Sequence, residues 1–193
     1  KHVITSKIEH HAVLRSCEYL EKLGYELTYL DVDAYGVIDL AQLREVLRED
    51  TTLVSVMTGN NEIGTIEPLD AVASMLRGTG TLFHTDAVQA VGKIPVDFRR
   101  LNVSGVNALT FSAHKLGGPK GAAALVIDKR VELEPLIAGG GHERGLRSGT
   151  ENVAAIVGFG VACELAVERM AVTASRLRVL REELELGLRD MGA

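Results

Sequence analysis

A chain of 193 residues, 46% hydrophobic and 24% charged, has the composition of one folded domain or of a large part of a bigger protein, which excludes a disordered segment. Its formal net charge of −5 argues against nucleic acid or an anionic membrane as a partner, and no apolar run reaches the ~18 residues of a membrane-spanning helix. Two cysteines are too few for a disulfide scaffold, so we expect a cytoplasmic protein.

Helical and strand-like patterns alternate along the chain. Apolar residues recur at helical spacing over His10–Leu23, and Gly24 follows where a helix ends in the left-handed conformation. Asp39 and Gln42 form a capping box that predicts the start of a helix over Leu40–Leu47. Further helices are predicted over Leu69–Arg77 and from Glu151 to about Met191, and the last of these has an apolar stripe at Leu177, Leu180, Leu184 and Leu188. The predicted strands are Tyr25–Leu30, Leu53–Met57, Thr81–His84, Ala108–Phe111 and Ala122–Ile127.

Short apolar strands that alternate with helices predict an α/β fold with a mostly parallel sheet flanked by helices. Ligands of such sheets bind at the carboxyl ends of the strands, so the loops after the strands should carry the chemistry. These loops, all rich in Gly, Asn, His, Asp or Ser, are Thr58–Pro68, Thr85–Lys93, Ser112–Gly121 and Gly139–Thr150. The chain opens on a polar, strand-like segment and closes inside a helical pattern, and we therefore expect a fragment or a split polypeptide.

Lys115 stands just after a predicted strand, in the segment Phe111–Gly121. His114 and several glycines flank it, and the glycines would let the backbone approach a flat ring closely. An amine forms an imine only after it loses its proton, which a free lysine with a pKa of ~10.4 seldom does at neutral pH unless burial or a neighbouring cation lowers that value. Taken alone, a lysine in such a loop is more often a solvated surface residue. Lys120, in Gly-Pro-Lys-Gly, is more typical of a tight turn.

A second polar group follows another predicted strand, at Asp86 and Gln89. A pyridine cofactor accepts electrons only while its ring nitrogen stays protonated, and a buried aspartate against that nitrogen keeps the proton there. Gln89 has the amide to donate a hydrogen bond to the phenolate oxygen of such a ring. A lone aspartate is more often a turn residue or a helix cap. The aspartate and, about thirty residues later, the Ser-x-His-Lys segment are more specific together than either is alone.

These segments resemble the class V aminotransferases, and within them the cysteine desulfurases, which depend on pyridoxal phosphate (PLP). Ser6–Val13 is similar to the Glu-His motif of that family, and Asn60–Gly64 is similar to its Asn-Asn-Glu-x-Gly loop. The Gly139–Thr150 segment resembles a signature of the desulfurase branch. The resemblance implies the large, PLP-binding domain of an aspartate aminotransferase-like transferase.

The resemblance also implies a role for each residue around the cofactor ring. Lys115 would bind PLP covalently, Asp86 would pair with the pyridine nitrogen, and Gln89 with the phenolate oxygen. His10 would stack on the ring and move protons, so that Lys115 and His10 are the implied catalytic residues. Asn61 would hold the phenolate or the substrate side of the cofactor.

On the phosphate side, the resemblance implies Ser112 and His114 as binding residues. The residue that matches Thr150 reaches the phosphate of the neighbouring subunit in that family, which implies a homodimer. Donors of these types, beside backbone N–H groups, suit a phosphate.

The implied division of the chain is a PLP-binding large domain over residues 1–160, without its N-terminal part, and a helix over 161–193 that leads toward an absent C-terminal small domain. The implied reaction converts L-cysteine to L-alanine and passes the sulfur as a persulfide to an acceptor or scaffold protein of iron–sulfur or thiolation pathways. The catalytic cysteine of that reaction is expected beyond the chain, so the chain alone should be inactive. Alternatives are a selenocysteine lyase, another PLP β-lyase, or a non-catalytic dimerisation module.

Several remaining residues have an ordinary structural interpretation. Cys17 and Cys163 lie in predicted helices and are more typical of a core than of a nucleophile. His11 and His84 are expected to pack at a strand edge or on the surface. Arg144 and Arg147 suit either an anionic ligand or a subunit contact, and the sequence leaves both open.

Overall fold

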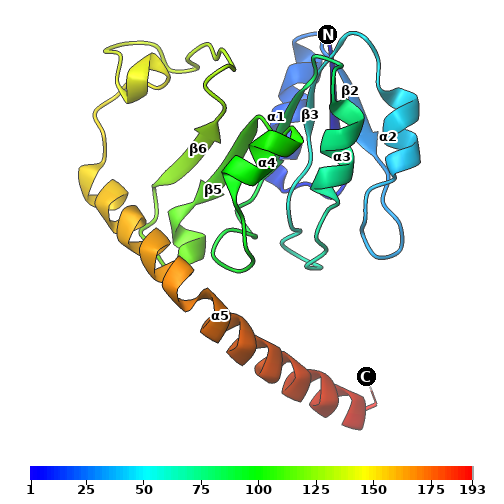
Figure 1. The fold of residues 1–193 in the computed structure, drawn as a ribbon, viewed down its shortest axis with the longest axis vertical. Coiled ribbons are helices and arrows are strands. Elements are labelled where there is room, and N and C mark those ends of the chain that lie inside the picture. Colours follow the sequence, from blue (N-terminus) through cyan, green and yellow to red (C-terminus); the bar gives the residue numbers. More distant parts are fainter. Residues whose placement is uncertain (193) are drawn as a thin grey trace.

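The computed structural model describes residues 1–192 (Figure 1). Six strands form one sheet in the order β2-β1-β3-β4-β5-β6, with β1 to β5 parallel and β6 antiparallel to β5. The strands are β1 (His2–Ser6), β2 (Glu26–Leu30), β3 (Thr51–Ser55), β4 (Leu82–Asp86), β5 (Ala108–Ser112) and β6 (Ala123–Ile127). The helices are α1 (His11–Lys22), α2 (Leu40–Val46), α3 (Leu69–Leu76), α4 (Phe98–Ser104) and α5 (Val153–Asp190), with 3₁₀ turns η1 (Ala113–Leu116) and η2 (Glu143–Gly145).

The main core lies between the sheet and α2, α3 and α4. Ile4, Val54 and Phe83 stand side by side on β1, β3 and β4, and all three are fully buried. They pack in one cluster with residues such as Leu43 of α2 and Val72 of α3. Because crossovers between parallel strands are right-handed, α1, which leads from β1 outward to β2, covers the face opposite to the helices that lead the other way.

The α/β fold with a mostly parallel sheet is confirmed, and the differences from the sequence prediction are local. The strand predicted over Thr81–His84 extends to Asp86, so this carboxylate belongs to β4 itself. The capping box is half formed: the Asp39 carboxylate accepts from the N–H groups of Ala41 and Gln42. The Gln42 side chain instead accepts a hydrogen bond of 2.7 Å from the backbone N–H of Asp31. This contact joins α2 to the end of β2.

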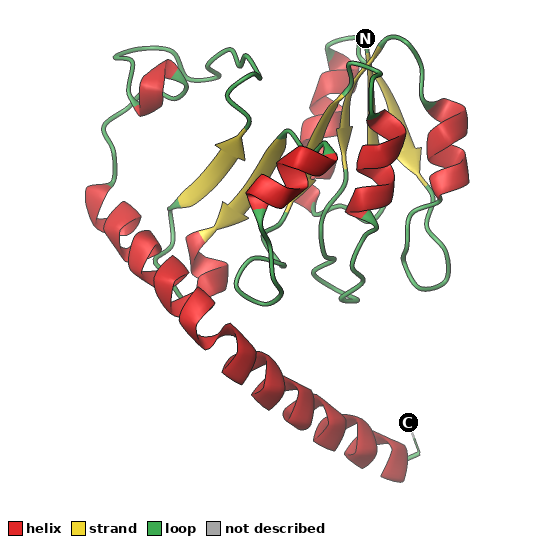
Figure 2. Cartoon of the chain, in the orientation of Figure 1, coloured by secondary structure: helices red, strands yellow, loops and turns green. Residues whose placement is uncertain are grey.

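The long helix α5 crosses the edge of the sheet and extends beyond it (Figure 2). Its first turns pack on the body through Ala155, Phe159 and Ala162, which are buried. The predicted leucine stripe in its second half is exposed. The expected boundary at residue 160 falls inside this continuous helix, and the division of the chain there stays a proposal. No helix of residues 1–192 is long and apolar enough to cross a membrane.

Candidate active site

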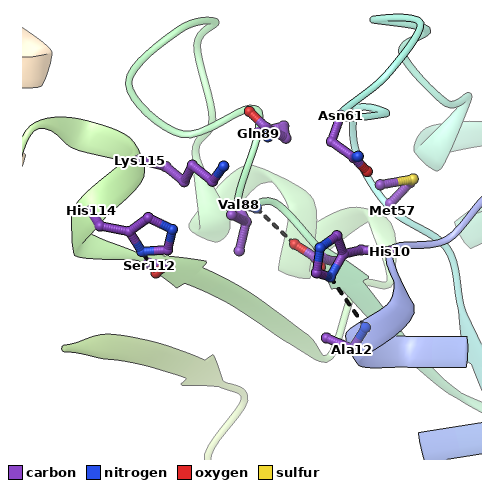
Figure 3. Close-up of a pocket in the computed structure, with 10 residues that line it drawn as sticks. His10, Ala12, Met57, Asn61, Val88, Gln89, Ser112, His114 and Lys115 are labelled. Atoms are coloured by element: carbon purple, nitrogen blue, oxygen red, sulfur yellow. Dashed lines mark hydrogen bonds between the residues drawn. The ribbon is translucent and has the colours of Figure 1, made fainter. Parts of the chain in front are cut away.

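A cavity of about 370 Å³ lies at the carboxyl edge of the parallel strands. The strand order changes direction between β1 and β3, and ligands of open α/β sheets bind at such a switch point. The loops after β1, β3, β4 and β5 all contribute, and Figure 3 shows their side chains turned toward one space. The lining residues are His10, Ala12, Met57, Asn61, Asp86, Val88, Gln89, Ser112, His114 and Lys115.

The lysine wall is built by the turn η1, directly after β5. Ser112 ends the strand, and its hydroxyl forms a hydrogen bond of 2.7 Å with Nδ1 of His114. Gly117 closes the turn with a φ of +81°, a left-handed conformation that a side chain disfavours. The turn thereby directs the side chains of His114 and Lys115 toward the same cavity (Figure 3).

A second wall carries Asp86 and Gln89. Asp86 is buried at the end of β4, and its Oδ1 accepts a hydrogen bond of 2.8 Å from the N–H of Val88, which fixes the carboxylate at the strand end. The side-chain oxygen of Gln89 accepts from Nζ of Lys93 at 3.1 Å. With its oxygen engaged, the Gln89 amide keeps its NH₂ group for a partner elsewhere.

His10 and Asn61 form a third wall. His10 is the N-cap of α1, and its Nδ1 accepts from the N–H of Ala12 at 3.1 Å, which leaves the ring proton on Nε2. Asn61 follows Asn60, whose Nδ2 donates to the carbonyl of Ile8 at 2.8 Å. The segment after β3 is therefore tied to the segment that carries His10.

Burial changes the protonation of several groups near the cavity. It raises the pKa of Glu9, next to His10, to about 7, against hydrogen bonds from the N–H of Met57 and the hydroxyl of Ser6 that lower it. Burial also lowers the pKa of His84, two residues before Asp86 on β4. Lys93 has a lowered pKa because of burial and because Lys115 lies nearby. Burial thus disfavours the charged forms of Glu9, His84 and Lys93.

Seven predicted site residues line this one cavity: His10, Asn61, Asp86, Gln89, Ser112, His114 and Lys115. Thr150, the eighth, does not line it, and its expected role toward a neighbouring subunit stays a prediction. The expectation that the Gly139–Thr150 loop shares the carboxyl edge is wrong. It follows β6, which runs antiparallel and so ends at the opposite edge (Figure 1).

Met57 and Val88 line the cavity although sequence reasoning did not single them out. Val88 lies in the predicted loop Thr85–Lys93, whereas Met57 was predicted as the last residue of a strand, and nothing in the sequence marks either apolar side chain as a cavity wall rather than core. Glu9 was noted only as part of the Glu-His motif, and its burial is not readable from the sequence.

The two cysteines behave as expected for structural residues. Cys17 is buried in α1, and burial raises the pKa of its thiol to about 11. Burial also raises the pKa of Cys163. The expectation that His84 packs at a strand edge or on the surface is wrong, because His84 is partly buried in the inner strand β4, between the hydroxyls of Ser55 and Thr110.

The fold and the cavity define an α/β ligand-binding domain, and the family model for class-V aminotransferases matches residues 1–191. The chain belongs to the class-V aminotransferase family. A cysteine desulfurase IscS from Dictyoglomus turgidum is 53% identical over 182 residues, which cover 94% of this chain and 45% of that relative. The mitochondrial cysteine desulfurase of Arabidopsis thaliana is 49% identical over 192 residues, which cover 98% of this chain and 42% of that relative.

Solved structures agree with this family. A NifS-like protein superimposes with a TM-score of 0.95 at 46% identity, over 100% of this chain and 52% of its own. A structure described as SspA in complex with cysteine gives a TM-score of 0.80 at 42% identity, over 84% of this chain and 47% of its own. The chain therefore spans about half the length of the relatives it matches.

The donor set of the cavity fits PLP, the cofactor of this family. The cofactor presents an aldehyde, a basic ring nitrogen, a phenolate oxygen and a phosphate, and it needs a primary amine, an acid and neutral donors to hold them. The cavity offers the Lys115 amine, the Asp86 carboxylate, the Gln89 amide, and the hydroxyl and imidazole of Ser112 and His114. Each group of the cofactor has a chemically suitable side chain in the wall.

Proposed function

We propose that this chain is the cofactor-binding part of a PLP-dependent cysteine desulfurase, which converts L-cysteine to L-alanine and passes the sulfur on as a persulfide. The observation that carries the proposal is that Lys115, Asp86 and Gln89 surround one cavity. The identity of 53% and 49% to cysteine desulfurases over nearly the whole chain supports this choice of reaction within the family.

Lys115, Asp86 and Gln89 would hold the reactive groups of the cofactor ring and control its charge. PLP, when bound, supplies an electron-accepting ring to an attached amino acid. Lys115 holds the aldehyde carbon, and Asp86 keeps the proton on the ring nitrogen. Gln89 donates its NH₂ group to the phenolate oxygen, because Lys93 already engages its side-chain oxygen.

The remaining residues would position the ring and the substrate. His10 stacks on the ring and moves protons through Nε2, since its Nδ1 accepts from the backbone. Asn61 holds the phenolate or the substrate side, and Ser112 and His114 bind the phosphate. Thr150 reaches the phosphate of a neighbouring subunit, which makes the protein a homodimer.

The persulfide step requires a cysteine that this chain does not supply. A thiol attacks sulfur as the thiolate, and a reactive cysteine therefore has a lowered pKa. The pKa values of Cys17 and Cys163 are both raised by burial. The chain alone would hold the cofactor without completing sulfur transfer to an acceptor or scaffold protein in a cytoplasmic iron–sulfur or thiolation pathway.

Absorbance of the chain titrated with PLP tests the cofactor assignment. We expect a band near the visible edge that Lys115→Ala abolishes and that Lys120→Ala, in the neighbouring turn, leaves unchanged. A band that survives Lys115→Ala would contradict the proposal. No binding by the unaltered chain would favour a non-catalytic module instead.

The reaction is tested in the same samples with L-cysteine and a reductant. We expect loss of the cofactor band on adding L-cysteine, with no repeated release of sulfide by the chain alone. Robust turnover would overturn the statement that the chain lacks the reactive cysteine. A response to selenocysteine but not to L-cysteine would identify a selenocysteine lyase.

A further inference from the structure

Glu9 is a buried carboxyl group that has no role in the proposed reaction. It follows β1 and directly precedes His10, and only 5% of its surface is exposed. Its Oε1 accepts two hydrogen bonds, from the hydroxyl of Ser6 at 2.9 Å and from the backbone N–H of Met57 at 2.8 Å. Its Oε2 has no hydrogen-bond partner among the described residues. A buried polar atom without a partner is costly, so its presence here calls for a reason.

The two hydrogen bonds of Oε1 join segments that are far apart in sequence. Ser6 ends β1, whereas Met57 lies in the segment after β3 that leads to Asn61. A second connection runs in parallel, from Nδ2 of Asn60 to the carbonyl of Ile8. The turn that carries His10 is therefore attached at two points to the segment that carries Asn61.

These connections lie at the boundary between two cavities. His10 and Asn61 line the cavity of about 370 Å³, and both also line an adjoining cavity of about 270 Å³ whose wall includes Glu9. The positions of His10 and Asn61 relative to each other set the shape of the wall that a flat ring would face. The Glu9 carboxyl connects the segment that carries His10 to the segment that carries Asn61, on the side of the adjoining cavity.

We propose that Glu9 is a positioning residue, which fixes His10 relative to Asn61 by accepting the Met57 N–H across the switch point between β1 and β3. The consequence for PLP binding rests on the proposed function, but the placement of His10 does not. An acceptor, not a negative charge, is what the geometry requires. A glutamine at position 9 retains the acceptor, whereas a methionine of similar size does not.

The electrostatic surroundings agree with a neutral Glu9. Burial, with a smaller contribution from the nearby carboxylates of Asp86 and Glu67, raises its pKa to about 7. No lysine or arginine forms an ion pair with it among the described residues. Below pH 7 the group is mostly neutral and resembles an amide in charge, which is why Glu9→Gln is the conservative variant.

Glu67 provides a matched control. It is 3% exposed, its Oε2 accepts the backbone N–H of Ile38 at 3.0 Å, and its Oε1 has no partner among the described residues. It lines a different cavity, beside α3 and α4. Glu67→Met therefore removes a buried acceptor of the same kind without touching the His10 wall.

The experiment compares Glu9→Met, Glu9→Gln and Glu67→Met with the unaltered chain by two measurements. The first, without cofactor, is the NMR signals of the histidine side-chain nitrogens, with His84 as the internal reference. The second is the dissociation constant for PLP. We expect Glu9→Met alone to shift the His10 signals and to weaken PLP binding about tenfold, the value of one hydrogen bond of ~1.4 kcal/mol. Glu9→Gln and Glu67→Met should stay within about twofold of the unaltered chain, because neither loses the Met57 contact.

Three results would overturn the proposal: unchanged His10 signals in Glu9→Met, an equal loss of PLP affinity in Glu67→Met, or an equal loss in Glu9→Gln. If the unaltered chain does not bind PLP, the proposed function fails and the His10 signals alone decide the role of Glu9. If Glu9→Met does not fold, Ser6→Ala takes its place in the experiment, because it removes one of the two hydrogen-bond donors to the Glu9 carboxyl. It should then shift the same His10 signals by a smaller amount, and no shift would contradict the proposal.

Discussion

At the scale of single residues, Asp86 is held in place by its own backbone surroundings before any ligand arrives. It ends β4, and one carboxylate oxygen is already engaged by the N–H of Val88 at 2.8 Å. The arrangement leaves the other oxygen for a ring nitrogen. Its negative charge, more than its shape, is what the proposed function needs.

The change Asp86→Asn separates charge from shape. Asparagine keeps an oxygen to accept from Val88 but cannot hold a proton on a pyridine nitrogen. We expect the circular dichroism spectrum to be unchanged and the melting temperature to stay within about 4 °C, while PLP binding weakens about tenfold. Binding and absorbance equal to those of the unaltered chain would count against the role of Asp86.

Glu9 gives a pH dependence of stability with a definite sign. Its pKa rises from an ordinary value of 4.5 to about 7 in the fold, so the folded chain binds this proton more tightly than the unfolded chain. The contribution of Glu9 to stability is therefore fully present below pH 4.5 and is lost as the pH rises toward 7, by about 3 kcal/mol. Glu9→Gln removes the titration.

Denaturant unfolding at a series of pH values measures this contribution. The stability of Glu9→Gln minus that of the unaltered chain should increase between pH 4.5 and 7 and then level off. Parallel stability curves over this range would show that Glu9 does not titrate as its burial requires.

At the scale of elements, the Lys115 turn is positioned by α5 through close packing. A Cβ at Gly118 would lie 3.0 Å from the Ala113 carbonyl oxygen and 3.0 Å from Cβ of Ala162. A Cβ at Gly158 of α5 would lie 3.1 Å from Cγ of Pro119 in the same loop. Small side chains thus let the helix approach η1 closely, and the placement of Lys115 depends on that approach.

Ala162→Leu should push α5 away from the lysine turn. We expect a loss of stability of about 1–3 kcal/mol from overpacking and a weaker affinity for PLP. Ala171→Leu, at an exposed position of the same helix, is the matched control and should change neither. Thermal unfolding and PLP titration of both variants provide the comparison, and equal behaviour of the two would contradict the dependence of Lys115 on α5.

The elements differ in how far the sequence predicts them, for physical reasons. The inner strands are apolar runs next to loops of Gly, Asn and His, so their positions and most of the cavity residues follow from local patterns. Helix α4 has seven residues with only Leu101 buried, which is too short for a periodic signal. The direction of β6 depends on pairing with β5, and no local pattern encodes it. The predicted position of the Gly139–Thr150 loop is therefore wrong. No local pattern indicates the hydrogen bond between the Glu9 carboxyl and the Met57 N–H either.

At the scale of the whole molecule, the chain covers about half the length of its relatives, and part of the site is expected from a second copy. Thr150 is exposed and does not line the cavity of its own chain. If it binds phosphate, it does so in a neighbouring subunit. A homodimer with shared sites is the arrangement that this requires.

Mixing two defective variants tests the shared site. Lys115→Ala and Thr150→Ala should each bind PLP poorly as homodimers. After exchange of subunits, about a quarter of the sites combine an intact Lys115 with Thr150 of the other copy and should bind tightly again. No recovery of tight binding in a sample that sedimentation shows to contain dimers would contradict this arrangement.

The pairing of an imine-forming amine with a nearby carboxylate is the central claim, and chemical trapping tests it most directly. The chain is incubated with PLP, reduced with borohydride, digested, and the modified peptide identified by mass spectrometry. We predict a single phosphopyridoxyl group, on Lys115. Modification of Lys93 or Lys120 in its place, or a scatter over surface lysines, would contradict the account.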